Sequence, residues 1–157
     1  MVSRDEIGSW LDGTPGGPST RGARLGLPPH GPGSLAPVGR RVVALLIDWF
    51  ACEIVAWMFT RDDVHARWPW DAPWYVTLLV FFGENVILVG TAGYTLGHWA
   101  LRLRVRRLVA DAPDGPPGPV RALARSVLLC VVLPAVVWDS DGRGLHDRAA
   151  GTAIVRR

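Results

Sequence analysis

Polar residues interrupt two apolar stretches of this chain, and their types could support proton exchange or cation binding. Asp48 and Glu53 lie inside the apolar stretch 39–59, and Glu84 and Asn85 lie in the middle of the next one. Two buried carboxylates that approach each other raise the pKa of at least one, so proton or ion handling is one interpretation. The other is a polar clamp, in which Glu84 is protonated or bonded to Asn85 and holds neighbouring helices together.

The spacing of Arg41 and Asp48 predicts that they share one face of the first helix. They are seven positions apart, which places them within about 20° of each other and about 10 Å apart along the helix axis. A charge at the depth of Asp48 costs about 2.5–3.5 kcal/mol on insertion scales, so this carboxylate should face the protein interior and find a donor. Arg41 extending along the helix is one candidate partner, and Arg125 is another.

No catalytic or metal-binding pattern accompanies these residues. Cys52 and Cys130 each fall in an apolar block, and the four histidines show no zinc spacing. His146 and Asp147 have no nucleophile in an elbow motif near them. We therefore expect a protein that is not an enzyme and that uses no cofactor and no metal.

Apolar blocks predict an all-α membrane protein in one domain. The chain has 157 residues, 49% of them hydrophobic, and the mean hydropathy is +0.20. Two blocks have the roughly 20 residues that cross a hydrocarbon core of about 30 Å, whereas the third is short for a span. The third helix is either a thin span or a re-entrant segment. The expected helices cover about 38–60, 73–93 and 120–138.

The remaining segments predict a flexible arm and a small sheet. Residues 1–36 are rich in Gly and Pro, and they carry no secretory signal, so we expect a disordered arm that precedes a membrane domain at 37–157. Alternating Leu and Arg over 101–106 predicts a short strand, with a β-hairpin closing on residues 119–120. The C-terminal GTAIVRR, within the tail 139–157, is a candidate for another strand.

The charge distribution predicts an orientation in the membrane. All seventeen positive side chains are arginines; residues 98–125 carry six of them against two aspartates, and residues 61–72 carry two against three. The positive-inside rule then places the N-terminus and the basic segments in the cytoplasm, where they contact anionic lipid headgroups. No reading motif accompanies the charge, so we expect no nucleic-acid partner.

Three motifs in this order resemble the RDD family of small bacterial membrane proteins. They are RVVALLID at 41–48, GYTLGHWALRLRV at 93–105 and GRGLHDRAAGTAIV at 142–155. The family is named for one arginine and two aspartates, and the resemblance implies that these are Arg41, Asp48 and Asp147. The Gly/Pro-rich arm is similar to actinobacterial members, and the location implied is the bacterial inner membrane, that is, the plasma membrane, in a multi-pass arrangement.

The middle motif of that family has the form Gly-x-Thr-x-Gly, which matches Gly93, Thr95 and Gly97. Tyr94 stands where a polar residue is more usual, and His98 stands where a basic residue is common. The segment lacks the lysine and the strand–helix context of a phosphate loop. It therefore predicts the exit turn of the second helix.

The tail motif predicts a structural contact. Asp147 is expected to cap a short helix at 148–151 and to pair with Arg41 or Arg125. Arg125 and Arg148 are the candidate ion-pair partners outside the family's three named residues.

The RDD family has no settled activity, and transport of an unknown ligand is one suggestion. We expect a structural or accessory role through helix packing, as a homo-oligomer or within a larger membrane complex. The alternative is an oligomeric transporter or cation/proton antiporter whose relay uses Asp48, Glu84 and Glu53.

Overall fold

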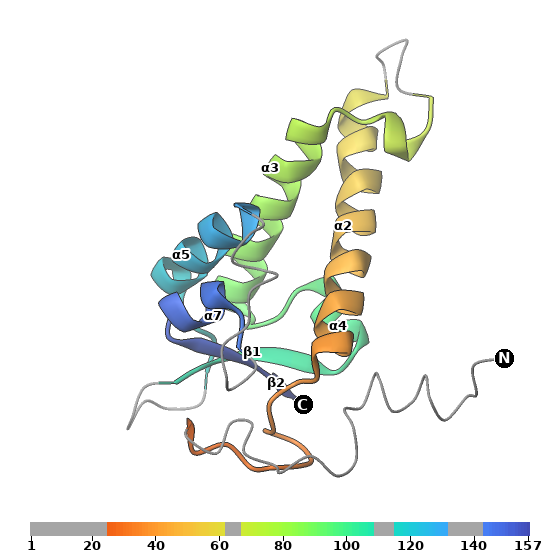
Figure 1. Ribbon diagram of the computed structural model, residues 1–157. Helices are drawn as coiled ribbons and strands as arrows, with labels where there is room; N and C mark the ends of the chain where they lie inside the picture. Colours follow the sequence, from red (N-terminus) through yellow and green to blue (C-terminus); the bar gives the residue numbers. More distant parts are fainter. Residues whose placement is uncertain (1–24, 62–66, 109–114, 132–142) are drawn as a thin grey trace, which may run out of the picture.

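Two antiparallel helices rise from a small sheet in the computed structural model, which describes residues 25–61, 67–108, 115–131 and 143–157 (Figure 1). Helix α2 (Val38–Thr60) runs the height of the molecule. Beside it lies α3 (Trp74–Glu84), which continues into the π-helical turn η3 (Asn85–Val89). Within the described residues, α2 is the one helix that is long and apolar enough to cross a membrane, and Trp74–Val89 is a shorter apolar helix.

Prolines mark where these helices begin. Pro37 and Pro73 occupy the N-cap positions of α2 and α3 in extended backbone conformations. A proline restricts the preceding residue and lacks an N–H, so it fits just before or within a first helical turn. The short 3-10 helix η2 (Pro69–Asp71) fills part of the link between the two long helices.

The third expected helix begins where it was placed but is described over a shorter range. Helix α5 (Pro119–Cys130) has a proline in its first turn. Its inward face buries Ala122, Arg125, Ser126 and Leu129, whereas its outward face exposes Val120, Leu123 and Val127. Of the expected residues 120–138, those from 132 onward lie outside the described residues.

The expected hairpin closing on residues 119–120 is wrong. Strand β1 (Leu103–Arg107) pairs antiparallel with the C-terminal strand β2 (Thr152–Arg156), with Val105 opposite Ile154. Residues 119–120 instead begin α5, because Pro119 has no N–H to donate to a ladder and its fixed φ suits a first helical turn. The candidate strand in GTAIVRR is therefore present, as the partner of β1.

The segment before α2 is packed against this sheet. Gly33 N–H donates to the Arg156 carbonyl, Ala36 N–H donates to the Ile154 carbonyl, and Leu35 forms a β-bridge with Val155. Leu27 is buried against Ala153 and Val155. Residues 25–36 of the expected arm are thus docked on the sheet, and residues 1–24 of it lie outside the described residues.

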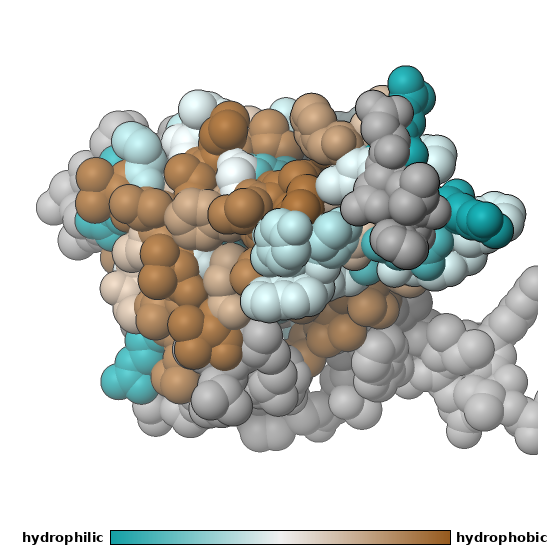
Figure 2. Space-filling view, turned by 90° about the horizontal axis from the view of Figure 1, so that it is seen from above, coloured by the Kyte–Doolittle hydropathy of each residue, from teal (hydrophilic) through white to brown (hydrophobic). Residues whose placement is uncertain are grey.

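The main core joins the sheet to the ends of the helices. Leu103, Val105 and Ile154 on one face of the sheet pack against Ala44 of α2, Val89 of η3 and Ala122 of α5. In contrast, the outer surface of α2 exposes large apolar side chains: Leu46, Phe50, Ile54, Val55, Met58 and Phe59. Figure 2, which views the molecule from the end opposite the sheet, shows apolar side chains over much of the surface. We call the end that carries the sheet the sheet end.

Candidate functional site

Asp48 is held by the first turn of a short helix that follows the second long helix. Thr95 is the N-cap residue of α4 (Leu96–Ala100), and its hydroxyl donates to Asp48 Oδ2 over 2.6 Å. The backbone N–H of Gly97 donates to Asp48 Oδ1, also over 2.6 Å. Asp48 is 2% exposed. Each of its two oxygens accepts a hydrogen bond from a donor in the same chain. A helix N-terminus offers unpaired N–H groups, which suit a carboxylate.

Glycine at position 97 lets α4 approach α2 closely enough for these bonds. A Cβ placed on Gly97 would collide with the backbone carbonyl of Ala44, one turn before Asp48 on α2. Gly93 has a φ of +81°, a conformation that glycine adopts readily, and its carbonyl accepts from Val105 N–H. In the middle motif, Gly93 is thus needed for the backbone conformation, Gly97 for close packing and Thr95 for helix capping.

His98 completes the capping arrangement. Its backbone N–H donates to Thr95 Oγ1 over 3.3 Å, and its ring Nδ1 lies 3.3 Å from the Thr95 backbone N and 2.6 Å from Thr95 Oγ1. His98 lies in α4, outside the two long helices. Burial, with a further contribution from the charge of Arg125, lowers the pKa of His98 to about 3. The ring is therefore neutral near pH 7, and Nδ1 can accept the Thr95 N–H.

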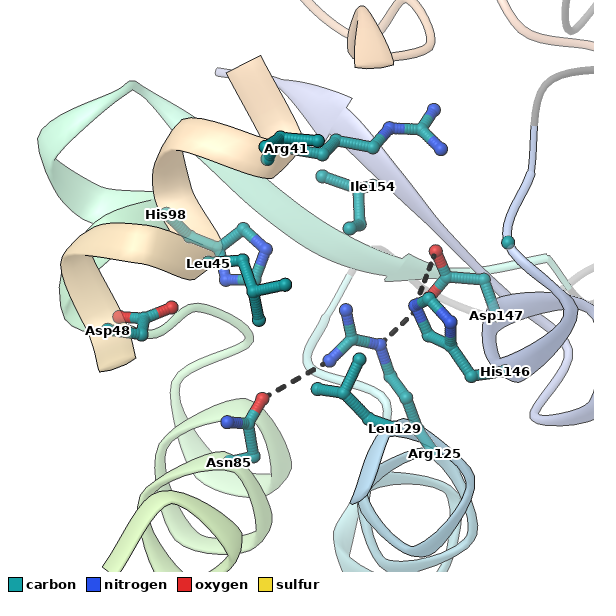
Figure 3. A pocket seen from close by; sticks show the side chains of 12 residues that line it. Arg41, Leu45, Asp48, Asn85, His98, Arg125, Leu129, His146, Asp147 and Ile154 are labelled. Atoms are coloured by element: carbon teal, nitrogen blue, oxygen red, sulfur yellow. Dashed lines mark hydrogen bonds and ion pairs between the residues drawn. The ribbon is translucent and has the colours of Figure 1, made fainter. Parts of the chain in front are cut away.

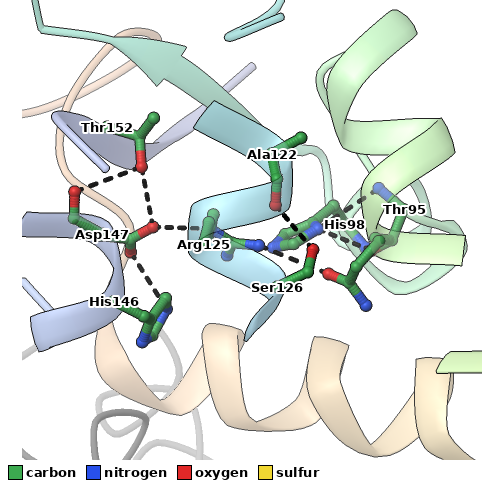
Figure 4. Close-up of polar contacts among 9 residues, drawn as sticks. Thr95, His98, Ala122, Arg125, Ser126, His146, Asp147 and Thr152 are labelled. Atoms are coloured by element: carbon green, nitrogen blue, oxygen red, sulfur yellow. Dashed lines mark hydrogen bonds and ion pairs between the residues drawn. The ribbon is translucent and has the colours of Figure 1, made fainter. Parts of the chain in front are cut away.

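A second buried cluster joins α5, η3 and the tail. Arg125 Nε donates to Asp147 Oδ1 over 2.8 Å (Figure 4), and Arg125 Nη1 donates to Asn85 Oδ1 over 3.4 Å (Figure 3). The side chains of Arg125 and Asp147 are 3% and 1% exposed. Thr152 at the start of β2 donates to the Asp147 side chain and backbone carbonyl. Removing one member of such a buried pair typically costs about 3–5 kcal/mol, so this pair fixes the tail onto α5.

The pKa of Asp147 depends on its contact with Arg125. Burial alone raises the pKa of Asp147, but Arg125 and, more weakly, His146 lower it by more, so its pKa is about 2. His146 Nε2 lies 3.5 Å from Asp147 Oδ2. Asp147 lies inside α7 (Leu145–Ala149), whose N-cap is Gly144, so the expected capping of a helix at 148–151 is wrong.

Of the expected pairings, the one between Asp147 and Arg125 is present. Arg41 points away from Asp48 (Figure 3), and the donors to Asp48 are instead Thr95 and Gly97. Arg148 is exposed and forms no ion pair within the part of the chain that the structure describes.

The other polar residues of the two apolar helices have local partners. Glu84 accepts from the Cys52 thiol over 3.0 Å and from the Leu96 N–H over 3.5 Å, so it links α2, α3 and α4. Asn85 donates to the Phe81 carbonyl one turn earlier. Glu53 accepts from the indole of Trp49 on its own helix. The structure does not place Glu53 with the Glu84–Asn85 pair.

Sequence reasoning did not single out the roles of His98, Thr152 and Cys52. The Thr95-x-x-His98 spacing is a form of capping box, and this signal could have identified His98. Thr152 gives no comparable signal, because its contact with Asp147 depends on how α7 leads into β2. Cys52 was noted only as lying in an apolar block, although a thiol can also donate weakly.

A cavity of about 60 Å³ lies between the two clusters, which is room for several water molecules. Asp48 and His98 line it on one side, and Arg125, His146 and Asp147 line it on the other (Figure 3). Within the described residues, no group of three or more His, Cys, Asp or Glu side chains is placed to hold a metal ion.

Asp48, Thr95, Gly97 and Asp147 all lie in the part of the chain that matches a protein-family model. The model of the RDD family matches residues 35–151, most of the chain. The chain belongs to the RDD family. It is accordingly a membrane protein, and the match says nothing about its molecular activity. No curated protein and no solved structure matches the chain.

Replacing Gly97 with Ala should destabilise this RDD protein by about 1–3 kcal/mol, because the new methyl group meets the Ala44 backbone. The matched control is Gly83→Ala in α3, where an added Cβ meets nothing within 4 Å and alanine favours the helix. Thermal unfolding of both variants in mild detergent measures the difference. Equal stability of the two variants would contradict the close packing of α4 on α2.

Acid should destabilise the fold through His98. The pKa of His98 falls from an ordinary 6.5 to about 3 on folding, so its contribution is present above pH 6.5 and is lost as pH falls towards 3. The slope approaches about 1.4 kcal/mol per pH unit for one proton. Unfolding free energies between pH 4 and 6.5 should show a shallower slope in His98→Asn. The effect of Asp147 is confined to lower pH, between its ordinary 3.8 and about 2. An unchanged slope in His98→Asn would contradict the neutral buried ring.

Proposed function

We propose that this RDD protein is a non-enzymatic structural or accessory component of a membrane, acting through helix packing and self-association or within a larger complex. The observation that supports this proposal is that both carboxylate oxygens of Asp48 are hydrogen-bonded within the chain. A carboxylate that carries an ion or a proton must exchange partners, whereas both oxygens of Asp48 are occupied by donors from the same chain. Asp147 is held through Oδ1, which accepts from Arg125 and Thr152, whereas its Oδ2 accepts no hydrogen bond among the described residues and lies 3.5 Å from His146 Nε2.

The outer surface supports an accessory role in the bilayer. Exposed apolar side chains cover the outward faces of α2 and α5, where they can meet lipid or another membrane helix. Trp68, Trp70 and Trp74 are exposed at the end opposite the sheet, as in an aromatic belt at a membrane interface.

The same geometry supports a multi-pass topology with an even number of crossings. The chain leaves the sheet end along α2 and returns along α3 and η3 to β1, and β2 pairs with β1. The start of α2 and the C-terminal strand therefore lie on one side, which the arginines of the sheet end assign to the cytoplasm of a bacterial inner membrane. Helix α5, with 12 residues and about 18 Å of length, begins at this end and serves as a shallow or re-entrant helix.

A specific observation favours transport as a second candidate. The cavity beside Asp48 and Asp147 has mainly apolar walls with several polar and charged side chains among them, and it has room for water. Thr95 Oγ1 lies 2.6 Å from both Asp48 Oδ2 and His98 Nδ1, so its single hydroxyl proton has two neighbouring acceptors. An oligomer could use such a chain as a proton relay.

Substitutions at Asp48 separate the two functions. Asp48→Leu leaves two buried donors without an acceptor, and we expect a loss of about 2–6 kcal/mol in stability. Asp48→Asn keeps a carbonyl for Gly97 N–H and should lose less. Glu53→Leu, which removes a carboxylate that accepts from Trp49 on its own helix, is the matched control and should accumulate like the wild type.

Flux measurements complete this test. Wild-type protein reconstituted in liposomes with an internal pH dye should give flat traces after sodium, potassium or lithium jumps. Ion-dependent proton movement that disappears in a normally folded Asp48→Asn variant would overturn the structural proposal in favour of a transporter.

The topology predicts the position of two reporters. A tag at the C-terminus should be protected in right-side-out vesicles, and a tag inserted within η2 should be accessible. The native N-terminus provides the reference, and it should behave like the C-terminus. Accessibility of the C-terminal tag together with protection of the N-terminus would mean an odd number of crossings.

A further inference from the structure

A second and larger cavity lies at the sheet end, away from the Asp48 and Asp147 clusters. Its volume is about 200 Å³. The exit of the second long helix at Gly93 and Tyr94 forms one wall, and β1 forms another. Gly115 and the C-terminal Arg157 close the remaining sides.

The lining of this cavity is strongly basic. Arg104 and Arg106, two positions apart on β1, contribute guanidinium groups from one strand, and Arg157 contributes a third from beyond the end of β2. No Asp or Glu side chain belongs to the lining among the described residues. A guanidinium carries five N–H donors in a planar fork that matches phosphate oxygens, so one arginine can serve several acceptors.

Backbone shape keeps the cavity open beside these charges. Gly93 adopts its left-handed conformation here, and a Cβ on it would press against the Val105 carbonyl at 3.3 Å and Pro116 at 3.4 Å. The Arg157 guanidinium lies 5.0 Å from the centroid of the Tyr94 ring, and this cation–π contact directs it to the cavity wall. The site is thus assembled from the middle motif, β1 and the end of the chain.

Its position relative to the membrane suggests the ligand. Gly93 and Tyr94 come shortly after the last turn of the second apolar helix, which places the cavity at headgroup depth in the orientation given under Proposed function. We infer that this cavity binds a phosphate group, carried either by the headgroup of an anionic phospholipid or by free phosphate. The inference rests on the proposed membrane placement but not on the role of Asp48.

Direct binding measurements test the site. Delipidated full-length protein in an uncharged detergent would be titrated with dioctanoyl phosphatidic acid, dioctanoyl phosphatidylcholine and inorganic phosphate. Native mass spectrometry reports the bound molecule, and thermal unfolding reports stabilisation. The variants are Arg104→Gln/Arg106→Gln and, separately, Arg157→Gln. The control is Arg148→Gln, which removes an exposed arginine of the same end that does not line the cavity.

The inference predicts that phosphatidic acid binds the wild type and stabilises it, whereas phosphatidylcholine does not. Affinity should fall by about tenfold or more in Arg104→Gln/Arg106→Gln and remain unchanged in Arg148→Gln. Stabilisation by inorganic phosphate alone, lost in the same variants, would assign the site to free phosphate. If the double variant does not fold, Arg157→Gln decides the test, because its side chain lies beyond the paired residues of β2.

Equal binding of phosphatidic acid by the wild type and a folded cavity variant would overturn the inference. So would a wild type that binds neither phosphatidic acid nor inorganic phosphate. Neither result affects the stability ranking of the Asp48 variants, so failure of this site is distinguishable from failure of the proposed structural function.

Discussion

A carboxylate within an apolar helix must be given donors, and the architecture of this protein is built around that requirement. Asp48 obtains them from the first turn of α4, whose close approach to α2 depends on the absence of a side chain at Gly97. Since α4 leads directly into β1, holding α4 against α2 also fixes the sheet at the end of the helices. The polar groups that interrupt the apolar helices thus attach these helices to the sheet.

The second buried cluster attaches the tail in the same way. Arg125 comes from α5 and Asp147 from α7, and neither would be stable in an apolar setting without the other. Thr95 and Gly97 of the middle motif and Asp147 of the tail motif therefore serve two separate junctions, one on α2 and one on α5. Residues of both junctions line the cavity that lies between them.

The sequence was sufficient for features that depend on local pattern. The long first helix, the proline that opens α5 and the alternation of Leu and Arg in β1 are all signals carried by a few neighbouring residues. The family assignment also followed from three short motifs and is confirmed by the match over residues 35–151. The cost of a charge within an apolar helix further indicated that Asp48 would face the interior, where it is 2% exposed.

Features that depend on tertiary contacts could not be predicted from such local sequence patterns. The donors of Asp48 lie 47 and 49 positions away, so a helical wheel could offer only Arg41 as a neighbour on the same helix. The partner of β1 was misassigned because the nearest downstream residues, 119–120, are closer in sequence than β2. Residues 25–36 have the composition of a flexible arm, yet the free edge of β2 supplies backbone partners that composition does not reveal.

The order of the strands along the chain has a consequence for biogenesis. Strand β2 and Asp147 are synthesised after α2, α3 and α5, so they reach the sheet only when the apolar helices have already left the ribosome. During that interval β1 lacks its partner strand and Arg125 lacks its carboxylate. The β1–β2 pairing and the Arg125–Asp147 contact can therefore form only after the residues that join α2 to α4 have been synthesised.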